Sequence, residues 1–212
     1  DTFALTHTTG SLTRVSQVLG DELPTLTANL SKALNSGDLY AHEAAKELLP
    51  LVMQAAMLAM QVDAVVANPP YMGGKGMNPA LKEFAKSNFP DSKADLFAMF
   101  MERGFEWCKP TGFNSMVTMQ SWMFLSSYEE IRQKHLTNHT ISTMAHLGSR
   151  AFNEITGEIV QTVAFIFSNK RLYDFKPVFF RLTSGGEDQK ISALLSNKSR
   201  IDNIRCEDIN KI

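Results

Sequence analysis

The segment Asn68-Pro69-Pro70-Tyr71 combines residue types that could bind and activate a planar amine. The two prolines fix the backbone, so the Asn68 side-chain oxygen and the Pro69 carbonyl can both point outward as hydrogen-bond acceptors. An aromatic NH2 group is a weak nucleophile because its lone pair is delocalised into the ring. Two acceptors that take both hydrogens return electron density to the nitrogen, which can then attack an activated methyl group. Tyr71 adds a flat face on which a base lifted from its stack can rest.

A short strand is expected to position this turn. Residues 62–67 (VDAVVA) are mostly apolar and β-branched, which predicts a buried strand. The two prolines that follow cannot continue a helix or a central strand, so the strand must end there. Because ligands in open α/β sheets bind beyond the carboxyl ends of the strands, the Asn68 turn is expected at a ligand-binding edge.

The rest of the chain predicts helices followed by a doubly wound α/β sheet. Residues 1–23 are expected to be a loose lead-in, and apolar spacing predicts a helix over residues 39–60 that Asp38 caps and Pro50 kinks or divides. Residues 109–112 (KPTG) are expected to close a helix, and residues 184–190 to form a polar loop. Further helices are expected over 95–108 and 128–136, and strands over 113–119, 140–147, 158–167 and 178–182. No helix separates the 140–147 and 158–167 strands, which predicts an antiparallel last strand.

Several further segments resemble landmarks of one enzyme family. Residues 95–100 (DLFAMF), 109–112 (KPTG) and 120–125 (QSWMFL) are similar to successive motifs of the adenine-N6-specific DNA methyltransferases. The stretches NPPYMGGKGMNPALKEFAK and VTMQSWMFLSS resemble the adenine methyltransferases of BREX phage-defence systems, and the resemblance covers residues 36–170. It implies the second half of a Rossmann-like methyltransferase sheet, which moves a methyl group from S-adenosylmethionine to the N6 amine of a flipped-out adenine.

The resemblance also implies roles for single residues. Asn68, Phe97 and Phe100 would contact the cofactor, while Tyr71 and Phe152 would pack against the flipped base. The residues by themselves leave alternatives open. Phe97 and Phe100 lie three positions apart in an apolar helix, as core residues do, and Phe152 is equally typical of a hydrophobic plug in a loop.

Two other patterns lack the spacing of known sites. Residues 73–76 (GGKG) do not match the phosphate-binding GxxxxGK[ST] pattern and are expected to be a mobile loop. Lys75 in this loop could contact a DNA phosphate, although a solvated lysine explains it as well. His135 and His139 lie four positions apart, but the Thr-Asn pair between them predicts a helix end, so no metal site is expected.

Composition favours the interpretation that this chain is one part of a larger cytoplasmic protein. The net charge of −1 is too low for this chain alone to grip duplex DNA. The two cysteines lie far apart, which is typical of a reducing compartment, and no apolar run could span a membrane. The chain begins with Asp1 and lacks a glycine-rich turn and a ribose-binding carboxylate. The expected partners are therefore DNA and the remaining domains of a parent polypeptide, which hold the cofactor half and the target-recognition region.

Three segments are expected on this interpretation: a lead-in and helical segment over residues 1–60, the acceptor-binding half of the catalytic domain over 61–170, and its C-terminal extension over 171–212. Two alternatives remain. The same turn could accept another planar NH2 group, on a protein glutamine or an RNA guanine. The chain could also be a catalytically silent DNA-binding or scaffolding module, although such a module would have no reason to retain both acceptors.

Overall fold

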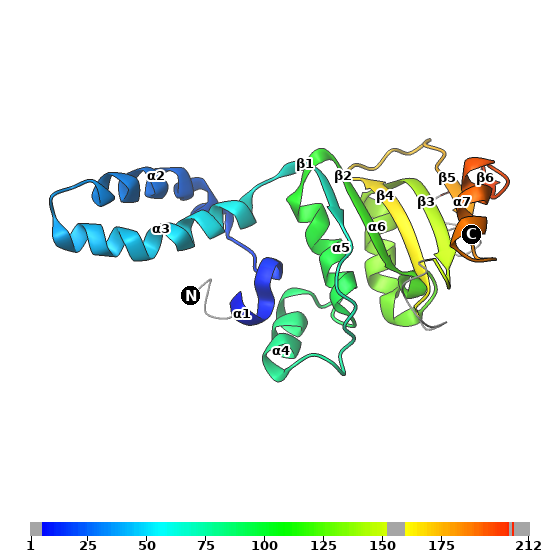
Figure 1. Ribbon diagram of the computed structural model, residues 1–212, viewed down its shortest axis with the longest axis horizontal. Helices are drawn as coiled ribbons and strands as arrows, with labels where there is room; N and C mark the ends of the chain where they lie inside the picture. The colour runs from blue at the N-terminus through cyan, green and yellow to red at the C-terminus, as the bar shows by residue number, and fades with distance from the viewer. Residues whose placement is uncertain (1–5, 152–159, 204, 206–212) are drawn as a thin grey trace. The chain divides into compact units, whose positions relative to one another are not determined.

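The chain divides into two compact units, Asp1–Gln61 and Val62–Ile212 (Figure 1). The structure, a computed structural model, describes residues 6–151, 160–203 and 205. Within these ranges, no helix combines the length and the apolar character that crossing a membrane requires.

The first unit is a helical hairpin in which α2 (Gln17–Leu34) packs against α3 (Leu39–Ala59). The short helices α1 (Thr6–Thr9) and η1 (Gly10–Leu12) precede it. As predicted, Asp38 caps α3, because its carboxylate accepts the amide hydrogens of Tyr40 at 2.9 Å and Ala41 at 3.3 Å. Helix α3 continues through Pro50, so the predicted division into two helices does not occur.

The loose lead-in predicted for residues 1–23 is wrong in its second part, where α2 begins. The Ser16 side-chain oxygen accepts the amide hydrogen of Leu19 at 3.3 Å and caps the helix. Gly20 and Pro24 disfavour helix interiors and concealed the pattern. Leucines nevertheless recur at helical spacing, at positions 19, 23, 26, 30 and 34. Packing of this apolar face against α3 outweighs the low helix propensity.

The second unit is built on a six-stranded sheet with the order β1-β2-β4-β3-β5-β6. Strands β1 and β2 are parallel, as are β3 and β5, and β4 lies between β2 and β3, antiparallel to both. The predicted antiparallel strand is therefore confirmed as β4, which follows β3 in the chain and pairs with both β2 and β3. The strands are β1 (Val62–Ala67), β2 (Cys108–Met119), β3 (Thr140–Gly148), β4 (Thr162–Ser168), β5 (Val178–Arg181) and β6 (Arg200–Ile201).

Helices α5 (Leu96–Trp107) and α6 (Glu129–Asn138) cover one face of this sheet (Figure 1). Gly104 allows α5 to approach β2 closely, because an added Cβ would lie only 2.7 Å from the Asn114 side chain and from the Met116 methyl carbon. Helix α4 (Pro79–Asn88) precedes α5, while η2 (Gln120–Met123) and η3 (Ser126–Tyr128) lead into α6. The core between helices and sheet contains Phe97, Met101, Trp122, Ile131, Met144, Phe165, Phe167 and Phe179.

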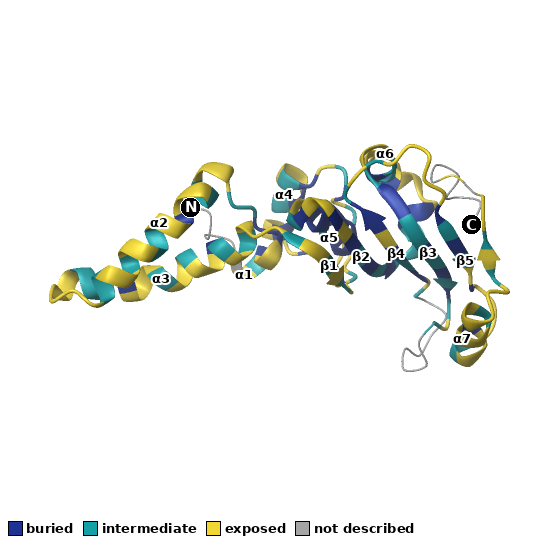
Figure 2. Ribbon diagram, turned by 90° about the horizontal axis from the view of Figure 1, so that it is seen from above, coloured by how far each residue is buried: buried dark blue, intermediate teal, exposed yellow. Residues whose placement is uncertain are grey.

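The opposite face of the sheet is partly exposed (Figure 2), and the residues that line it are mostly apolar. Neighbouring strands bring Val117, Ala164 and Ala145 together in one row, and these residues line a hollow of about 300 Å³. Strand β1 pairs only with β2 among the described strands, and Val66 is 80% exposed. The prediction that β1 is a buried strand is therefore wrong, because it lies at the sheet edge and one of its faces is uncovered within this unit.

Two other boundaries differ from prediction. Helix α5 ends at Trp107, and residues 109–112 belong to β2, where the pairing register with β1 shifts between Val62 and Ala64. The polar loop predicted over residues 184–190 contains the start of α7 (Glu187–Leu195). Two acidic residues in its first turn and the Gln189 side chain, which accepts the Gly186 amide hydrogen at 3.2 Å, are helix-start signals.

Two histidines lie at the end of α6, of which His135 is buried and His139 is half-buried. His135 is 1% exposed and packs against Phe105 and Phe167, and neither of its ring nitrogens has a hydrogen-bond partner among the described residues. His139 stacks on Phe105 with ring centroids 3.7 Å apart. Burial, then the charge of Lys134, lowers the pKa of His139 to about 4, and burial lowers the pKa of His135 well below its usual value.

The free energy of unfolding is therefore expected to fall as the pH drops below about 6.5. The folded state keeps both histidines neutral, whereas the unfolded chain protonates them near their ordinary pKa, so acid favours unfolding. The expected slope is up to about 1.4 kcal/mol per pH unit for each histidine, and for His139 it ends near pH 4. Denaturant unfolding between pH 7.5 and 4.5 measures it. A His135→Leu, His139→Gln variant should show a smaller slope, and an unchanged slope would contradict this origin.

Candidate functional site

The turn after β1 lies at the carboxyl edge of the parallel strands, as predicted. Strands β1, β2 and β3 run in the same direction, so their carboxyl ends meet at one edge. Asn68 follows β1 directly and Gln120 follows β2 at this edge. Within the turn, Pro69 is buried, whereas Asn68 and Pro70 are exposed. The buried proline anchors the turn and leaves the Asn68 side chain accessible.

The hydroxyl group of Tyr71 connects the turn to β2. Its oxygen lies 3.2 Å from Asn68 Oδ1 and 3.3 Å from the carbonyl oxygen of Val117. Because a tyrosine has a single hydroxyl hydrogen, it donates to one of these acceptors at a time. The Asn68 amide oxygen is thus oriented by a donor and can exchange that donor for another one.

The ring of Tyr71 rests on buried aromatic side chains. Phe97, which has no exposed surface, meets it edge-on with ring centroids 6.1 Å apart, and Tyr128 packs against Phe97 at 5.5 Å. Burial, then the charge of Asp95, raises the pKa of Tyr71 above its ordinary value. The hydroxyl group therefore stays protonated at neutral pH and remains a hydrogen-bond donor.

Asp95 joins the segment after the turn to the start of α5. Its Oδ1 accepts the amide hydrogens of Met72 at 2.9 Å and Phe97 at 3.3 Å. The Leu96 amide also donates to the Met72 carbonyl oxygen at 3.1 Å. The sequence analysis included Asp95 in the motif at residues 95–100 but gave it no role of its own. An aspartate directly before an apolar helix is nevertheless a recognised capping signal.

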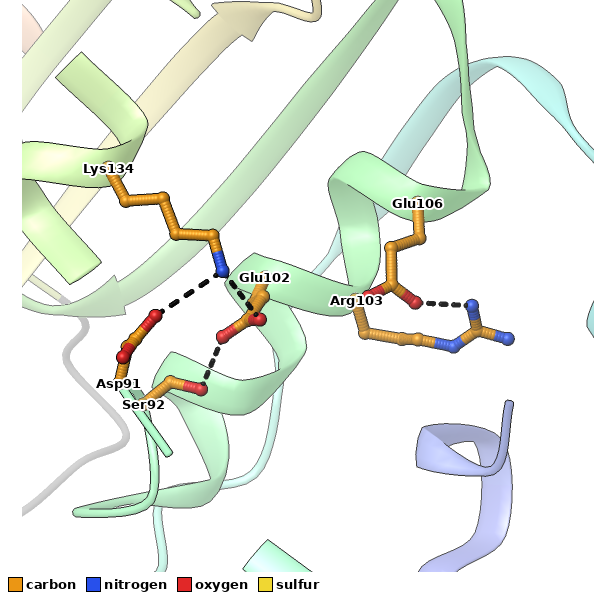
Figure 3. A network of polar contacts seen from close by, with 6 residues as sticks. All are labelled: Asp91, Ser92, Glu102, Arg103, Glu106 and Lys134. Atoms are coloured by element: carbon orange, nitrogen blue, oxygen red, sulfur yellow. Dashed lines mark hydrogen bonds and ion pairs between the residues drawn. The ribbon is translucent and has the colours of Figure 1, made fainter. Parts of the chain in front are cut away.

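A polar network holds the chain just before Asp95 (Figure 3). Lys134 of α6 pairs with Glu102 of α5 at 3.0 Å and with Asp91 at 3.4 Å. The Ser92 hydroxyl donates to the second Glu102 oxygen at 2.8 Å. Since Glu102 is buried, this network fixes the Asp91–Ser92 turn against both helices.

A second polar cluster lies at the same edge, at the ends of β2 and β3 and the start of β4. His146 Nε2 lies 2.5 Å from Gln120 Oε1, and the Gln120 amide donates to the Gln161 carbonyl oxygen at 2.9 Å. The ring of Phe124, which is 41% exposed, packs against His146. Sequence reasoning missed this cluster, because it joins three separate segments, around residues 120, 146 and 161, that come together only through strand pairing.

The remaining predicted site residues, Phe100, Lys75 and Phe152, differ in burial and in location. Phe100 is half-buried on α5, one helical turn beyond Phe97, and Lys75 is exposed. The loop that carries Lys75 is tied down, because the Gly74 amide donates to the Ala94 carbonyl oxygen at 3.2 Å. Phe152, the predicted second stacking residue, lies outside the described residues.

Comparisons with known proteins show which family this chain resembles. Residues 8–152 match the family described as Eco57I restriction-modification methylase. The chain is 51% identical over 99% of its length to a protein named adenine-specific methyltransferase BrxX from Escherichia coli O9:H4 (strain HS), of which it spans 17%. It is 42% identical over 68% of its length to adenine-specific methyltransferase PglX from Lacticaseibacillus casei (strain Zhang), of which it spans 12%.

A solved structure supports the fold. A chain from a study of the assembly and conformational transition of a type I restriction-modification system superposes with a TM-score of 0.54 at 13% identity. The superposition covers 93% of this chain and 56% of the other, which confirms the predicted α/β class. On the strength of the family match and the relative with 51% identity, the chain belongs to the Eco57I restriction-modification methylase family.

Proposed function

We propose that this chain is the acceptor-binding part of an enzyme that transfers a methyl group from S-adenosylmethionine to the N6 amine of a flipped-out adenine in DNA. The observation that carries the proposal is the Asn68-Pro69-Pro70-Tyr71 turn at the carboxyl edge of the sheet. Its accessible Asn68 oxygen stands beside a supported tyrosine ring. The family and the names of both relatives favour adenine in DNA over other planar amines.

In this proposal, the adenine amine replaces the Tyr71 hydroxyl group as the donor to Asn68 Oδ1. The hydroxyl can then donate to the Val117 carbonyl oxygen, which lies at a similar distance, so the exchange leaves no polar group unpaired. The Pro69 carbonyl oxygen takes the second amine hydrogen, and Tyr71 supports the face of the base. These residues hold the nitrogen in place and raise its electron density. As the new N–C bond forms, the bond between the methyl group and the donor sulfur breaks, and the amine proton passes to solvent water.

The chain offers part of a site for S-adenosylmethionine, whose sulfonium supplies the activated methyl group. Asn68, at the edge of the sheet, is exposed, and Phe100, on α5, is half-buried, and we assign both to the cofactor side. Phe97 has no exposed surface and packs against Tyr71. We therefore propose that Phe97 supports the cofactor site from within the core, while Phe100 supplies the accessible aromatic surface. The glycine turn and ribose-binding carboxylate that complete such sites are expected from another segment of the enzyme.

The exposed apolar side of the sheet also supports the proposal that this chain is part of a larger protein. Val66, Val117 and Ile166 lie on the face that this unit leaves partly uncovered, and the edge of β1 is available for pairing. The chain spans only 17% of its relative BrxX. We infer that the cofactor-binding half packs on this face and that a target-recognition region is also present, in a cytoplasmic protein. Lys75 is proposed to contact a DNA phosphate and Phe152 the second face of the flipped base.

Methylation assays on the full-length protein test the proposed function. Incubation with DNA and isotopically labelled S-adenosylmethionine should give N6-methyladenine, identified by mass spectrometry of the digested DNA. A glutamine-containing peptide and a structured RNA are the matched alternative substrates. Label in the peptide or the RNA but not in DNA would overturn the substrate, and label in none of the three would favour a silent binding module.

A further inference from the structure

We propose that Asp95 is a positioning residue that sets the geometry of both the base-binding turn and the first turn of α5. The inference rests on the proposed function of the Asn68 turn. Asp95 lies outside that turn and contacts neither acceptor. It acts through Met72, the residue directly after Tyr71, and through Phe97, the residue beneath the Tyr71 ring.

One carboxylate oxygen joins the two segments. Asp95 Oδ1 accepts both amide hydrogens, from Met72 at 2.9 Å and from Phe97 at 3.3 Å, so a shift of either segment breaks a bond to a shared atom. Backbone bonds on both sides of Asp95 strengthen the junction: Leu96 donates to the Met72 carbonyl oxygen, and Gly74 donates to that of Ala94. The position of Tyr71 is thus fixed from its backbone side by Met72 and from its ring side by Phe97.

The surroundings of Asp95 explain how a buried carboxylate can act as the acceptor for both backbone amides. The residue is 7% exposed, and among the described residues no basic side chain forms an ion pair with it. Burial raises the pKa of Asp95, while the hydrogen bonds from the Met72 and Phe97 backbone amides act in the opposite direction and favour the charged form, as the dipole of α5 does. An ordinary cap needs only the bond to the helix, and the second bond, to Met72, is what links the cap to the functional turn.

Three substitutions separate capping from positioning. Asp95→Asn keeps an oxygen at the same reach, so both bonds can form. Asp95→Ser keeps the helix cap, but the serine side chain is one bond shorter than that of aspartate. Its hydroxyl oxygen therefore cannot also reach the amide hydrogen of Met72. Asp95→Ala removes both bonds. In the full-length enzyme we expect kcat close to wild type for Asp95→Asn and reduced on the order of tenfold to a hundredfold for Asp95→Ser, with cofactor affinity retained.

Thermal unfolding and hydrogen–deuterium exchange are measured on the same proteins. Asp95→Ser should unfold near the wild-type temperature, while the peptide containing Met72 exchanges faster than in wild type and in Asp95→Asn. Wild-type kcat and wild-type exchange in Asp95→Ser would overturn the proposal and leave Asp95 a simple cap. The exchange comparison does not depend on catalysis. An inactive wild-type protein would therefore count against the proposed function, while the Met72 exchange would still decide whether Asp95 joins the two segments.

Discussion

Alanine in place of Asn68 is expected to lower methyl transfer by the full-length enzyme about a hundredfold or more. The substitution removes the side-chain oxygen that takes one amine hydrogen and leaves the Pro69 carbonyl as the single acceptor. Stability should change little, because Asn68 is exposed and its side chain bonds only to Tyr71 among the described residues. Single-turnover methylation of a DNA duplex measures the rate, and calorimetric titration with S-adenosylmethionine measures the cofactor affinity.

The matched control for this experiment is Asn68→Asp. Aspartate has a similar shape and keeps an acceptor oxygen within reach of the amine and of the Tyr71 hydroxyl group. Its activity should therefore lie well above that of Asn68→Ala. A normal rate for Asn68→Ala would remove Asn68 from the mechanism, and equal loss in both variants would show that the amide NH2 group, rather than the oxygen, is the required feature.

Trp122→Ala is expected to lower the free energy of unfolding by about 3–5 kcal/mol. The indole is 1% exposed, lies edge-on to Phe165 at 5.7 Å and contacts Phe167, so its removal leaves a cavity between α6 and the sheet. The indole nitrogen also donates to Thr118 Oγ1 at 3.1 Å. Urea unfolding, followed by circular dichroism, measures the change.

Trp122→Phe and Thr118→Val divide this effect into its parts. Phenylalanine keeps an aromatic ring and loses the bond to Thr118, and valine removes the bond from the other side. We expect each single change to cost much less than Trp122→Ala. The two together should cost less than the sum of the single changes, because both remove the same hydrogen bond. A Trp122→Ala protein of wild-type stability would contradict the placement of this side chain in the core.

Local signals carried the predictions that the structure confirms around the site. The apolar run before two prolines fixed where β1 ends, since proline leaves few conformations open to the chain. Asp38 was a correct cap because capping depends on residues at most three positions apart. The same local rules misled for residues 17–23, because Gly20 and the Pro24 that follows have low helix propensity, yet tertiary packing stabilises α2.

The sequence by itself determined that a strand would deliver a rigid acceptor turn to the edge of an α/β sheet, because residue type and short spacing control strand ends, turns and caps. Only the tertiary structure decided which distant groups surround that turn. The Tyr71 hydroxyl group meets a carbonyl 46 positions away, Asp95 reaches back 23 positions to Met72, and His146 meets Gln120 across strand pairing. The exposed edge of β1 was also a tertiary matter, since β-branched residues favour strands in general and do not specify how many neighbours a strand will have.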